Sequence, residues 1–450
     1  MTTSEKLHGQ WSSRLAFIIA ASGSAIGLGN IWKFPYLVGE NGGGAFVLVY
    51  LACVAIIGLP IMMAETMLGR RGRQSPINAM AKLARAAGAH PAWRLVGWIG
   101  VLAGFLILSY YSVIAGWSMA YLFKMGGGFL DGGSAEATQR AFIDMKSAPD
   151  VQMVWHSLFM AATILIVSRG VSEGIEKVTR IMMPGLFLML IILDIYAAGT
   201  TGFGEGMSFL FKPDFSKLSG ESLLIAMGQA FFSLGLGMGS IMVYGSYLPD
   251  HVSIARSSLI VAGLDTAVAL LAGIAIFPVV FSNHLEPGMG PGLIFETLPL
   301  AFMHMPAGAL FGTVFFLLVF FAAITSAIAL IEPAVAWLSE NRGLDRMKSS
   351  LYAGAGCWLL GLGTVLSFNM WSEKSVFGKT FFDAIDFLTA DVLLPVGGIL
   401  VAIFAGWIMK RSESAEEMDV GGLYPYWLGL TRFIAPTAVA VILLHGIGLF

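Results

Sequence analysis

The sequence predicts an all-α polytopic membrane protein with about eleven transmembrane helices, arranged as a 5+5 inverted repeat in which helices 1 and 6 are broken. The first observation is the composition, which is 57% hydrophobic and only 12% charged, whereas soluble domains carry about 25% charged residues. The second is that the apolar residues form stretches of the roughly 20 residues that a membrane helix requires. The third is that two of these stretches, five helices apart, are interrupted by glycines.

Hydropathy places the membrane spans at eleven stretches. In chain order they cover residues 12–37, 42–69, 93–124, 154–170, 177–200, 221–248, 254–283, 308–339, 347–369, 380–409 and 426–450. The first five spans form a first repeat over residues 12–200, and the next five form a second repeat over residues 221–410. Residues 1–11 form a cytoplasmic N-terminal segment, residues 201–220 an extracellular loop, and residues 411–450 a cytoplasmic loop and helix 11.

The charges of the connections predict the orientation. With the N-terminus in the cytoplasm, 17 of the 26 Lys and Arg residues lie in inner segments and 7 in outer ones, and the other two, Lys33 and Arg432, lie within spans. Basic residues favour the cytoplasmic side, so we expect the N-terminus inside and the C-terminus outside. The outer segment 284–307 contains the motif EPGMGPG, which forms either a lid or a plain surface loop.

The first span is the one around which the other features are organised. It contains SGSAIGLGNIWKFPY, with several glycines near its middle. Glycine weakens a helix, and a broken helix is tolerated at membrane depth where it lines a cavity. The alternative is a glycine seam for close helix packing, which leaves Asn30 and Lys33 unexplained.

The sixth span carries a second glycine-interrupted stretch, QAFFSLGLGMGSIMVYGSY. An offset of five helices reverses the direction of the chain through the membrane, so the two breaks occupy corresponding positions of two inverted halves. Paired breaks of this kind in a membrane protein indicate a central binding site.

The two breaks predict the chemistry of that site. Unwinding exposes N–H groups, which attract a carboxylate, and C=O groups, which attract a cation, so one site can hold both ends of an α-amino acid. Asp265 lies within the seventh span, where an intramembrane carboxylate is a functional hypothesis by default. Thr325 and Ser326 of the eighth span offer hydroxyls, although such residues often bond their own helix. Oxygen ligands of this kind suit Na⁺.

Other polar residues inside the spans leave alternatives open. Tyr110 and Tyr111 of the third span are either interfacial residues or partners of a substrate carboxylate. Glu65 of the second span is placed to accept bonds from unwound N–H groups. Glu332 of the eighth span is either a satisfied core carboxyl or a proton site, and the role of Gln229 stays open.

Charged and aromatic residues near the ends of the spans predict two gates, which close over the central site from the outer and from the inner side. Lys33 requires a partner at its depth, and Asp386 or Asp383 of the tenth span can supply it from the outer side. On the inner side Trp11, Tyr247 and Glu340 form a second closure, unless the aromatic residues are belt anchors.

The fifth span carries its own helix-weakening residues. Gly174 and Pro184 either allow its inner half to unwind or fix a proline kink.

These motifs carry a family resemblance. The run GSAIGLGNIWKFPY, followed by ENGGGAF and GLP, resembles the neurotransmitter:sodium symporter family, as do GQAFFSLGLGMG and TSAIALIEP. The resemblance covers about residues 8 to 410 and is greatest to eleven-helix bacterial members that take hydrophobic amino acids. It implies a multi-pass protein of the bacterial inner membrane that carries out sodium-coupled symport by alternating access and is not an enzyme. A transport-inactive amino-acid sensor on the same fold is the alternative.

The resemblance also implies site residues. The first Na⁺ site comprises the carbonyl of Ala25 with the side chains of Asn30, Ser233 and Asp265. The second comprises the carbonyls of Gly23, Ile26 and Ala322 with the hydroxyls of Thr325 and Ser326. The substrate contacts Ser24, Ala25, Leu28, Gly29, Ile107, Tyr111, Phe232, Ser233, Gly235, Met238, Ala327 and Leu330. Lys33 and Asp386 match the outer gate, and Trp11 and Glu340 match the inner gate.

Departures from the family pattern sharpen the expectation. Asp265 places a fixed negative charge where chloride-dependent members have a neutral network, and Ala269 stands one turn on, so we expect chloride independence. The implied pocket is apolar and roomy, so we expect Leu, Ile, Val, Phe, Tyr or Trp as substrates. The basic residue of the inner gate falls at His8, with Lys6 nearby.

Composition predicts few further partners. The net charge of −2 does not suggest a nucleic-acid partner. The two cysteines suggest neither a disulfide framework nor a metal site. A twelfth helix is absent from the pattern. The sequence leaves open the oligomeric state, the sodium stoichiometry and proton counter-transport.

Overall fold

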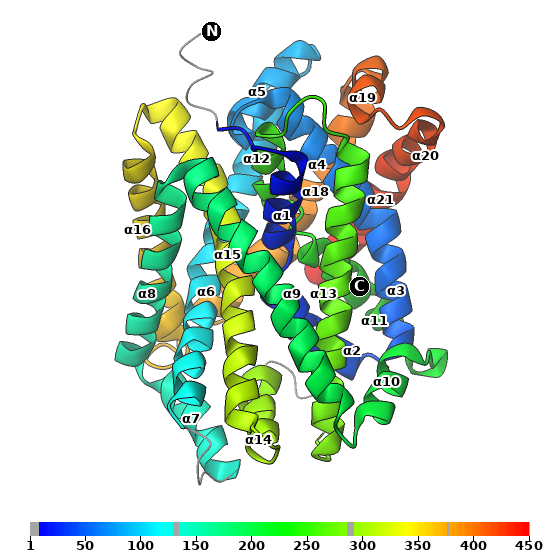
Figure 1. The fold of residues 1–450 in the computed structure, drawn as a ribbon. Helices are drawn as coiled ribbons and strands as arrows, with labels where there is room; N and C mark the ends of the chain where they lie inside the picture. The colour runs from blue at the N-terminus through cyan, green and yellow to red at the C-terminus, as the bar shows by residue number, and fades with distance from the viewer. Residues whose placement is uncertain (1–8, 129–134, 286–291, 376–377, 450) are drawn as a thin grey trace.

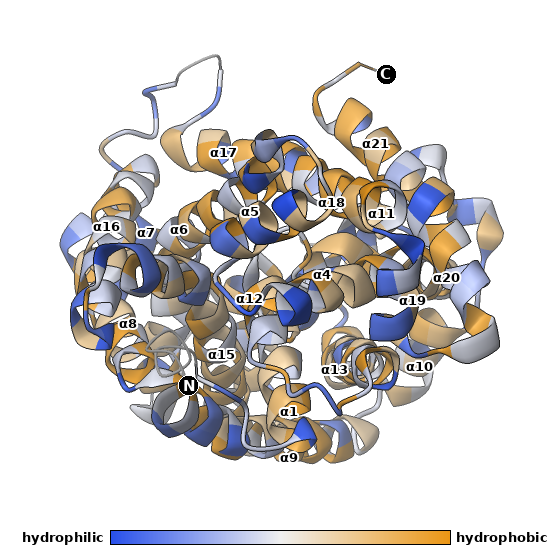
Figure 2. Ribbon diagram, turned by 90° about the horizontal axis from the view of Figure 1, so that it is seen from above, coloured by the Kyte–Doolittle hydropathy of each residue, from blue (hydrophilic) through white to orange (hydrophobic). Residues whose placement is uncertain are grey.

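The computed structural model describes residues 9–128, 135–285, 292–375 and 378–449, which form a helical bundle (Figure 1). Among these residues β pairing is limited to the isolated bridge between Gly43 and Pro213. The chain enters at the end of the bundle where α5 and α19 lie, and α7, α10 and α14 lie at the opposite end (Figure 1). Seen from the first of these ends, the bundle is rounded, with α12 near its middle (Figure 2).

The first half of the chain contains the first five predicted spans. Its helical segments are α1 Arg14–Ala25, η1 Gly29–Lys33, α2 Phe34–Glu40, α3 Gly44–Cys53, η2 Val54–Gly58, α4 Leu59–Gly72, α5 Pro76–Ala86, η3 Pro91–Trp93, α6 Arg94–Gly126, α7 Ala135–Ser147, α8 Pro149–Ser168, η4 Val171–Glu176, α9 Lys177–Ala198, α10 Phe203–Phe211 and η5 Phe215–Lys217.

The second half contains the other six. Its helical segments are α11 Gly220–Ser233, α12 Ser240–Ser246, α13 Ile254–Ser282, η6 Leu293–Thr297, α14 Leu298–Met303, α15 Gly308–Arg342, α16 Arg346–Ser367, α17 Phe381–Asp386, η7 Phe387–Leu393, α18 Leu394–Ile403, η8 Phe404–Ile408, α19 Arg411–Met418, η9 Gly421–Leu423, α20 Tyr424–Gly429, η10 Leu430–Ile434 and α21 Ala435–Gly446.

Helix capping explains where several spans begin. The side chains of Ser13, Ser219 and Asp345 accept the backbone N–H three residues ahead at the starts of α1, α11 and α16. Thr380 does the same for α17. These bonds satisfy N–H groups that a helix leaves free at its first turn.

The predicted all-α membrane fold is confirmed. Nine helical stretches of the described residues are long and apolar enough to cross a bilayer, and the pair α1 and η1–α2, bent by 52°, makes a tenth. The sixth predicted span is divided into α11 and α12, of 14 and 7 residues, which are each too short alone. The division of the chain into two inverted repeats stays a prediction.

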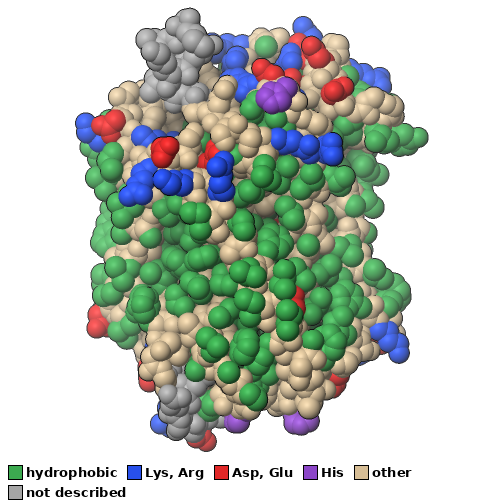
Figure 3. All heavy atoms as spheres, in the orientation of Figure 1, with side chains coloured by type: hydrophobic (Ala, Val, Ile, Leu, Met, Phe, Trp, Pro, Cys, Tyr) green, Lys and Arg blue, Asp and Glu red, His purple; other side chains and the backbone are tan. Residues whose placement is uncertain are grey.

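A band of hydrophobic side chains crosses the face of the molecule seen in Figure 3. Lys and Arg side chains gather beside this band at the end where α5 and α19 lie (Figures 1 and 3). This distribution is typical of a protein whose apolar belt contacts lipid.

The long connections at the opposite end differ from the simple loops that the sequence suggested. They contain the short helices α7, α10 and α14, because apolar residues such as Phe142, Leu210 and Phe302 pack into the bundle and are buried. Residues 286–291, which hold most of the EPGMGPG motif, lie outside the described residues, so the lid expected there remains a prediction.

Glycines allow the inner half of the sixth span to lie close against α4. A Cβ atom at Gly69 would lie 1.9 Å from the carbonyl oxygen of Met242, and one at Gly245 would lie 2.6 Å from that of Thr66. Close backbone approach of this kind is how small residues pack membrane helices, and it fixes α12 beside the scaffold.

Candidate binding site at two helix breaks

The first break separates α1 from η1. Ile26 has an extended backbone, with φ −71° and ψ 107°, and ends α1. The side chain of Asn30 closes the break, because its Oδ1 accepts the N–H of Gly27 at 3.1 Å. The N–H of Leu28 points away from the helix and donates to the hydroxyl of Tyr111 at 3.4 Å. The predicted break in the first span is present, and it presents a backbone N–H group to the third span.

The second break separates α11 from α12. Gly235, Gly237 and Gly239 have φ angles of 66°, 76° and 71°, which glycine adopts at little cost and other residues do not. The N–H of Gly237 donates to Oε1 of Glu65 at 2.7 Å. The expectation that Glu65 accepts a bond from an unwound N–H group is confirmed.

A buried carboxylate connects the two breaks. Oδ1 of Asp265 accepts the side-chain amide of Asn30 at 2.7 Å, and Oδ2 accepts the hydroxyl of Ser233 at 2.7 Å. Tyr50 in turn donates to Ser233 at 3.3 Å. Asn30 and Asp265 are 0% exposed and Ser233 is 2% exposed.

The charge of this carboxylate lacks a protein counter-ion. Across the described part of the chain, no Lys, Arg or His forms an ion pair with Asp265. A buried charge without a partner is costly. The carboxylate of Asp265 and the hydroxyl of Ser233 are hard oxygen donors that fit a monovalent cation. The side chain of Asn30 turns its amide nitrogen toward them, while its oxygen accepts the N–H of Gly27.

A second cluster of oxygens joins α15 to the end of α1. The hydroxyl of Ser326 donates to the carbonyls of Ile26 and Gly23 at 3.1 and 3.3 Å. Thr325 donates to the carbonyl of Ala322 at 3.1 Å. The five residues of the second predicted sodium site thus lie together. The described residues hold no group of three or more His, Cys, Asp or Glu side chains that would suit a transition metal.

A small cavity lies between the breaks. Of the twelve predicted substrate residues, eleven line it together with Gly27 and Ser326, and the exception is Ala327. Ala327 is fully buried. The cavity has a volume of about 30 Å³, which is close to the share of one water in the liquid.

A larger cavity of about 220 Å³ lies next to it. Leu28, Gly29, Tyr111 and Phe232 line both cavities, so a ligand larger than water requires these side chains to move or the two spaces to join.

The predicted outer gate lines the larger cavity. Lys33 and Asp386 both border it, but they form no ion pair within the described structure, and Nζ of Lys33 lies 4.7 Å from the ring centroid of Phe232. Asp383, the other possible partner, accepts bonds from the backbone and hydroxyl of Thr380. The gate role of Lys33 and Asp386 stays a prediction.

At the end of the bundle that we predict to face the cytoplasm, Trp11 is a buried anchor rather than a belt residue. It is 2% exposed, its Nε1 donates to the carbonyl of Tyr244 at 2.9 Å, and its N–H donates to the carbonyl of Tyr247 at 3.1 Å. Its ring packs edge-on against both tyrosines. The N-terminal segment is thereby joined to α12.

The buried carboxyl of Glu332 is satisfied. Tyr247 donates to its Oε1 at 2.7 Å, and Arg346 forms a bidentate ion pair with it. Of the two interpretations left open by the sequence, the structure supports the satisfied core carboxyl. Arg346 was not recognised in the sequence because its position between two spans is that of an ordinary topology charge.

Glu340, the third inner-side residue, binds the start of α5. Its carboxylate accepts the N–H of Ser75 and the side-chain amide of Asn78, both at 2.7 Å. His8 and Lys6 lie outside the described residues.

The N-terminal end of the fifth span bonds the start of α1. Residues 171–176 form the π-helical segment η4, and α9 continues through Pro184. Glu176 accepts the N–H of Ser12 at 3.1 Å and also its hydroxyl, and Arg180 donates to Glu176 at 2.6 Å. No sequence pattern indicated this contact, since Glu176 has the position of an ordinary solvated charge at the end of a span.

Gln229, whose role was left open, bonds the first break. Its Nε2 donates to the carbonyl of Gly29 at 2.9 Å. It therefore helps to hold the start of η1 against α11.

Comparison with known proteins supports the same interpretation. The model of the sodium:neurotransmitter symporter family matches residues 8–130 and 140–450. The chain is 42% identical over 451 residues to the uncharacterized sodium-dependent transporter YhdH of Bacillus subtilis, covering 99% of each chain. It is 34% identical to an uncharacterized sodium-dependent transporter of Haemophilus influenzae, covering 99% of this chain and all of the relative.

A solved structure is similar along almost the whole chain. The crystal structure of MhsT in complex with L-phenylalanine superposes with a TM-score of 0.90 at 44% identity. The match covers 97% of this chain and 99% of that one.

Proposed function

The chain belongs to the sodium:neurotransmitter symporter family of sodium-coupled transporters, and on this premise we propose that it takes up hydrophobic and aromatic L-amino acids together with Na⁺, without chloride. The observation that carries the proposal is the buried Asp265 carboxylate, which bonds residues of both broken spans and forms no ion pair with the Lys, Arg and His residues that the structure describes.

Two sodium ions bind in this proposal. The first binds among Asp265, Asn30, Ser233 and the carbonyl of Ala25, where it neutralises the carboxylate. The second binds among the carbonyls and hydroxyls that Ser326 already brings together. Carbonyl, hydroxyl and carboxylate oxygens are hard ligands that suit a hard cation.

The substrate is a zwitterion in this proposal. Its carboxylate binds the N–H groups of Leu28 and Gly29 and the hydroxyl of Tyr111, which already bonds Leu28. Its ammonium binds the carbonyls of Ala25, Phe232 and Ser233.

The side-chain end of the site is apolar, and the solved relative was crystallised with L-phenylalanine. Ile107, Met238 and Leu330 line it, so a charged side chain finds no counter-ion there. Apolar pockets discriminate a methylene only by about 1–3 kcal/mol, so the specificity is broad.

Chloride is dispensable because the protein supplies a fixed negative charge. Asp265 lies at the proposed first sodium site, and Ala269, one turn further along α13, is a fully buried apolar residue. Neutrality at the site is therefore reached by sodium and the carboxylate alone.

Transport proceeds by alternating access in the bacterial inner membrane, with the N-terminus in the cytoplasm and the C-terminus outside. Na⁺ and the amino acid enter through the cavity bordered by Lys33 and Asp386, and the approach of these two residues closes it. Release requires that the contacts of Trp11 and Ser12 on the inner side separate.

The proposal is tested by uptake into proteoliposomes that contain the purified protein. We expect an inward sodium gradient to drive accumulation of radiolabelled leucine and tryptophan, at the same rate when gluconate replaces chloride. Replacement of sodium by choline abolishes it. Accumulation in choline refutes sodium coupling, and a loss in gluconate refutes chloride independence. Sodium-dependent binding without accumulation identifies the protein as an amino-acid sensor instead.

A further inference from the structure

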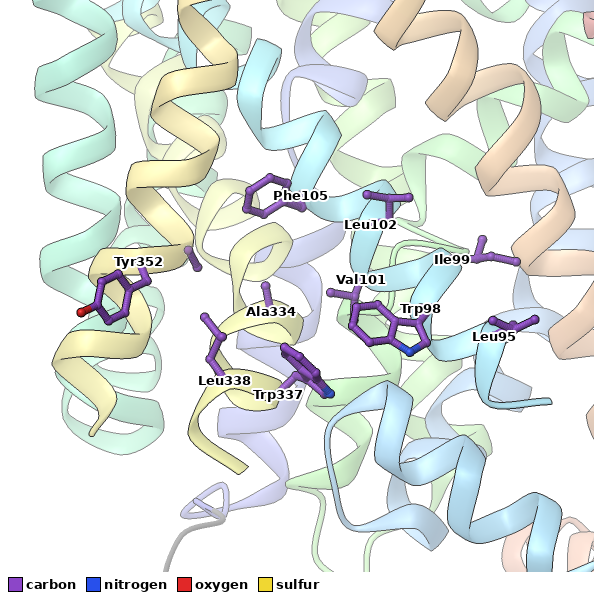
Figure 4. Close-up of a pocket in the computed structure, with 11 residues that line it drawn as sticks. Leu95, Trp98, Ile99, Val101, Leu102, Phe105, Ala334, Trp337, Leu338 and Tyr352 are labelled. Atoms are coloured by element: carbon purple, nitrogen blue, oxygen red, sulfur yellow. The ribbon is translucent and has the colours of Figure 1, made fainter. Parts of the chain in front are cut away.

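A large cavity lies outside the transport site, on the lipid-facing side of α6, α15 and α16. It has a volume of about 540 Å³, within the roughly 300–1,000 Å³ typical of ligand sites. Leu102 and Phe105 border it from α6, Ala334 and Trp337 from α15, and Tyr352 from α16 (Figure 4). All of its lining residues are hydrophobic or aromatic.

The lining excludes a polar ligand and favours a hydrocarbon chain. A zwitterion or a peptide would meet no carboxylate, amide or basic group in the cavity. Leu102 and Tyr352 are 46% and 61% exposed on helices that cross the membrane, so the cavity is open to lipid. An acyl chain from the bilayer can therefore enter it.

The position of the cavity along the helices determines the orientation of a bound lipid, with its headgroup at the level of the nearby helix ends. It is lined by the first turns of α6, the last turns of α15 and the first turns of α16. These ends lie at the side of the bundle that carries most basic side chains, which is the proposed cytoplasmic side. Trp98 and Trp337 meet at the cavity with ring centroids 4.9 Å apart, and tryptophan favours the level of the lipid headgroups.

Basic residues stand one helical turn beyond the cavity on all three helices. Arg94 precedes Trp98 by four residues, Arg342 follows Leu338 by four, and Lys348 precedes Tyr352 by four. Residues four apart share a helix face and are separated by about 6 Å along the axis.

These three basic residues, Arg94, Arg342 and Lys348, are called the basic rim. All three are exposed. Within the described residues Arg94 and Arg342 form no ion pair, and Lys348 has only an exposed contact with Asp345 at 3.3 Å. The rim is therefore available to an anionic group at the membrane surface.

We propose that this cavity is a binding site for one anionic phospholipid of the cytoplasmic leaflet, with an acyl chain between α6, α15 and α16 and the headgroup phosphate on the basic rim. Juxtamembrane Lys and Arg attract anionic lipids. A second copy of this chain is a poorer occupant, because a two-fold contact through this face would bring two basic rims together.

The test is a lipid competition on the purified, delipidated protein, read by native mass spectrometry. The protein is offered equal amounts of phosphatidylglycerol and phosphatidylcholine with identical chains. We expect the wild type to retain phosphatidylglycerol at least fivefold over phosphatidylcholine. The variant R94Q/R342Q/K348Q retains the two lipids within a factor of two.

A matched control removes three basic residues at the same membrane level but away from the cavity. The variant K177Q/R256Q/K410Q neutralises exposed residues of α9, α13 and the segment before α19 and keeps the wild-type preference. An equal loss of preference in this control, or no preference in the wild type, overturns the proposal.

A second pair of variants tests the acyl-chain position. Leu102→Trp and Ala353→Phe each add bulk at the cavity wall, and we expect at least a fivefold loss of retained phosphatidylglycerol in either. Sodium-dependent amino-acid binding reports that the variants are folded. Full retention of the lipid by folded variants, or the appearance of lipid-free dimers in the wild type, overturns the assignment.

Discussion

Replacing Asp265 with asparagine removes one buried negative charge and preserves the shape of the side chain. The two carboxylate oxygens accept bonds of 2.7 Å from Asn30 and Ser233, so a cation held among these side chains lies within about 4 Å of the charge. At that distance unit charges attract by about 4 kcal/mol at an effective dielectric constant of 20. Asparagine keeps one oxygen ligand, so we expect a net loss of about 3 kcal/mol, or roughly a hundredfold in sodium affinity.

The assay is a sodium titration of radiolabelled leucine binding to purified protein, with the half-saturating sodium concentration as the readout. Tyr50→Phe is the matched control, because it removes a neutral 3.3 Å bond to Ser233 and leaves the charge in place. Such a bond contributes about 0.5–1.5 kcal/mol, so the control shifts the half-saturating concentration by less than about tenfold.

Thermal unfolding gives an independent readout, because without sodium the substitution is not expected to lower stability although it lowers the affinity for sodium. Without sodium, the asparagine variant unfolds at the same or a higher temperature than the wild type, since a buried carboxylate without a counter-ion is costly. With sodium, the wild type gains more stability than the variant. The reasoning is refuted if the folded variant keeps a sodium half-saturation within threefold of the wild type, or if Tyr50→Phe has an equal effect.

Three further predictions concern the helix breaks and the inner side. Glu176→Gln weakens the hydrogen bond that the N–H of Ser12 donates to this side chain, so amide hydrogen exchange in the first turns of α1 accelerates by about tenfold. The control Glu173→Gln, which changes an 80% exposed side chain, leaves that exchange rate unchanged. Arg346→Met leaves the buried carboxylate of Glu332 without its ion-pair partner, so the free energy of unfolding falls by about 3–5 kcal/mol. The control Arg342→Met, at an exposed position, changes the free energy of unfolding by no more than about 0.5 kcal/mol. Equal effects of the two substitutions on thermal unfolding would contradict the assignment. Gly237→Ala meets both a φ of 76° and the carbonyl of Leu394 at 2.7 Å, so stability falls by about 2 kcal/mol and leucine binding weakens. Gly263→Ala, which meets open space, tests whether the effect is local.

The fold and the two breaks were predictable because they depend on local sequence. Hydrophobic runs have the length of a bilayer span, and glycines at 235, 237 and 239 mark a backbone that other residues resist, as their positive φ angles show. The bond from Gly237 to Glu65 followed from the same logic, since unwound N–H groups require an acceptor.

The contacts that the sequence did not reveal depend on distant parts of the chain. Arg346 and Glu176 look like surface charges in the sequence, yet each binds a partner brought to it by the tertiary fold. Short helices such as α10 replace expected loops, because residues like Leu210 become buried only when the bundle exists. The mean hydropathy over a window of about 19 residues does not detect such short amphipathic segments, because their polar residues lower the mean.

The anchoring of Trp11 has a practical consequence for experiments that modify the N-terminus. The indole and the backbone N–H of this residue donate to the carbonyls of Tyr244 and Tyr247 at the end of α12, so the start of α1 is attached to the second broken span. An affinity tag or fluorescent protein fused ahead of residue 9 leaves these bonds intact. A truncation that removes Trp11 frees the start of α1. If the proposed transport cycle holds, we expect this truncation to shift the resting population toward the conformation that is open on the proposed cytoplasmic side, so a protein shortened at this point reports on a different conformational ensemble.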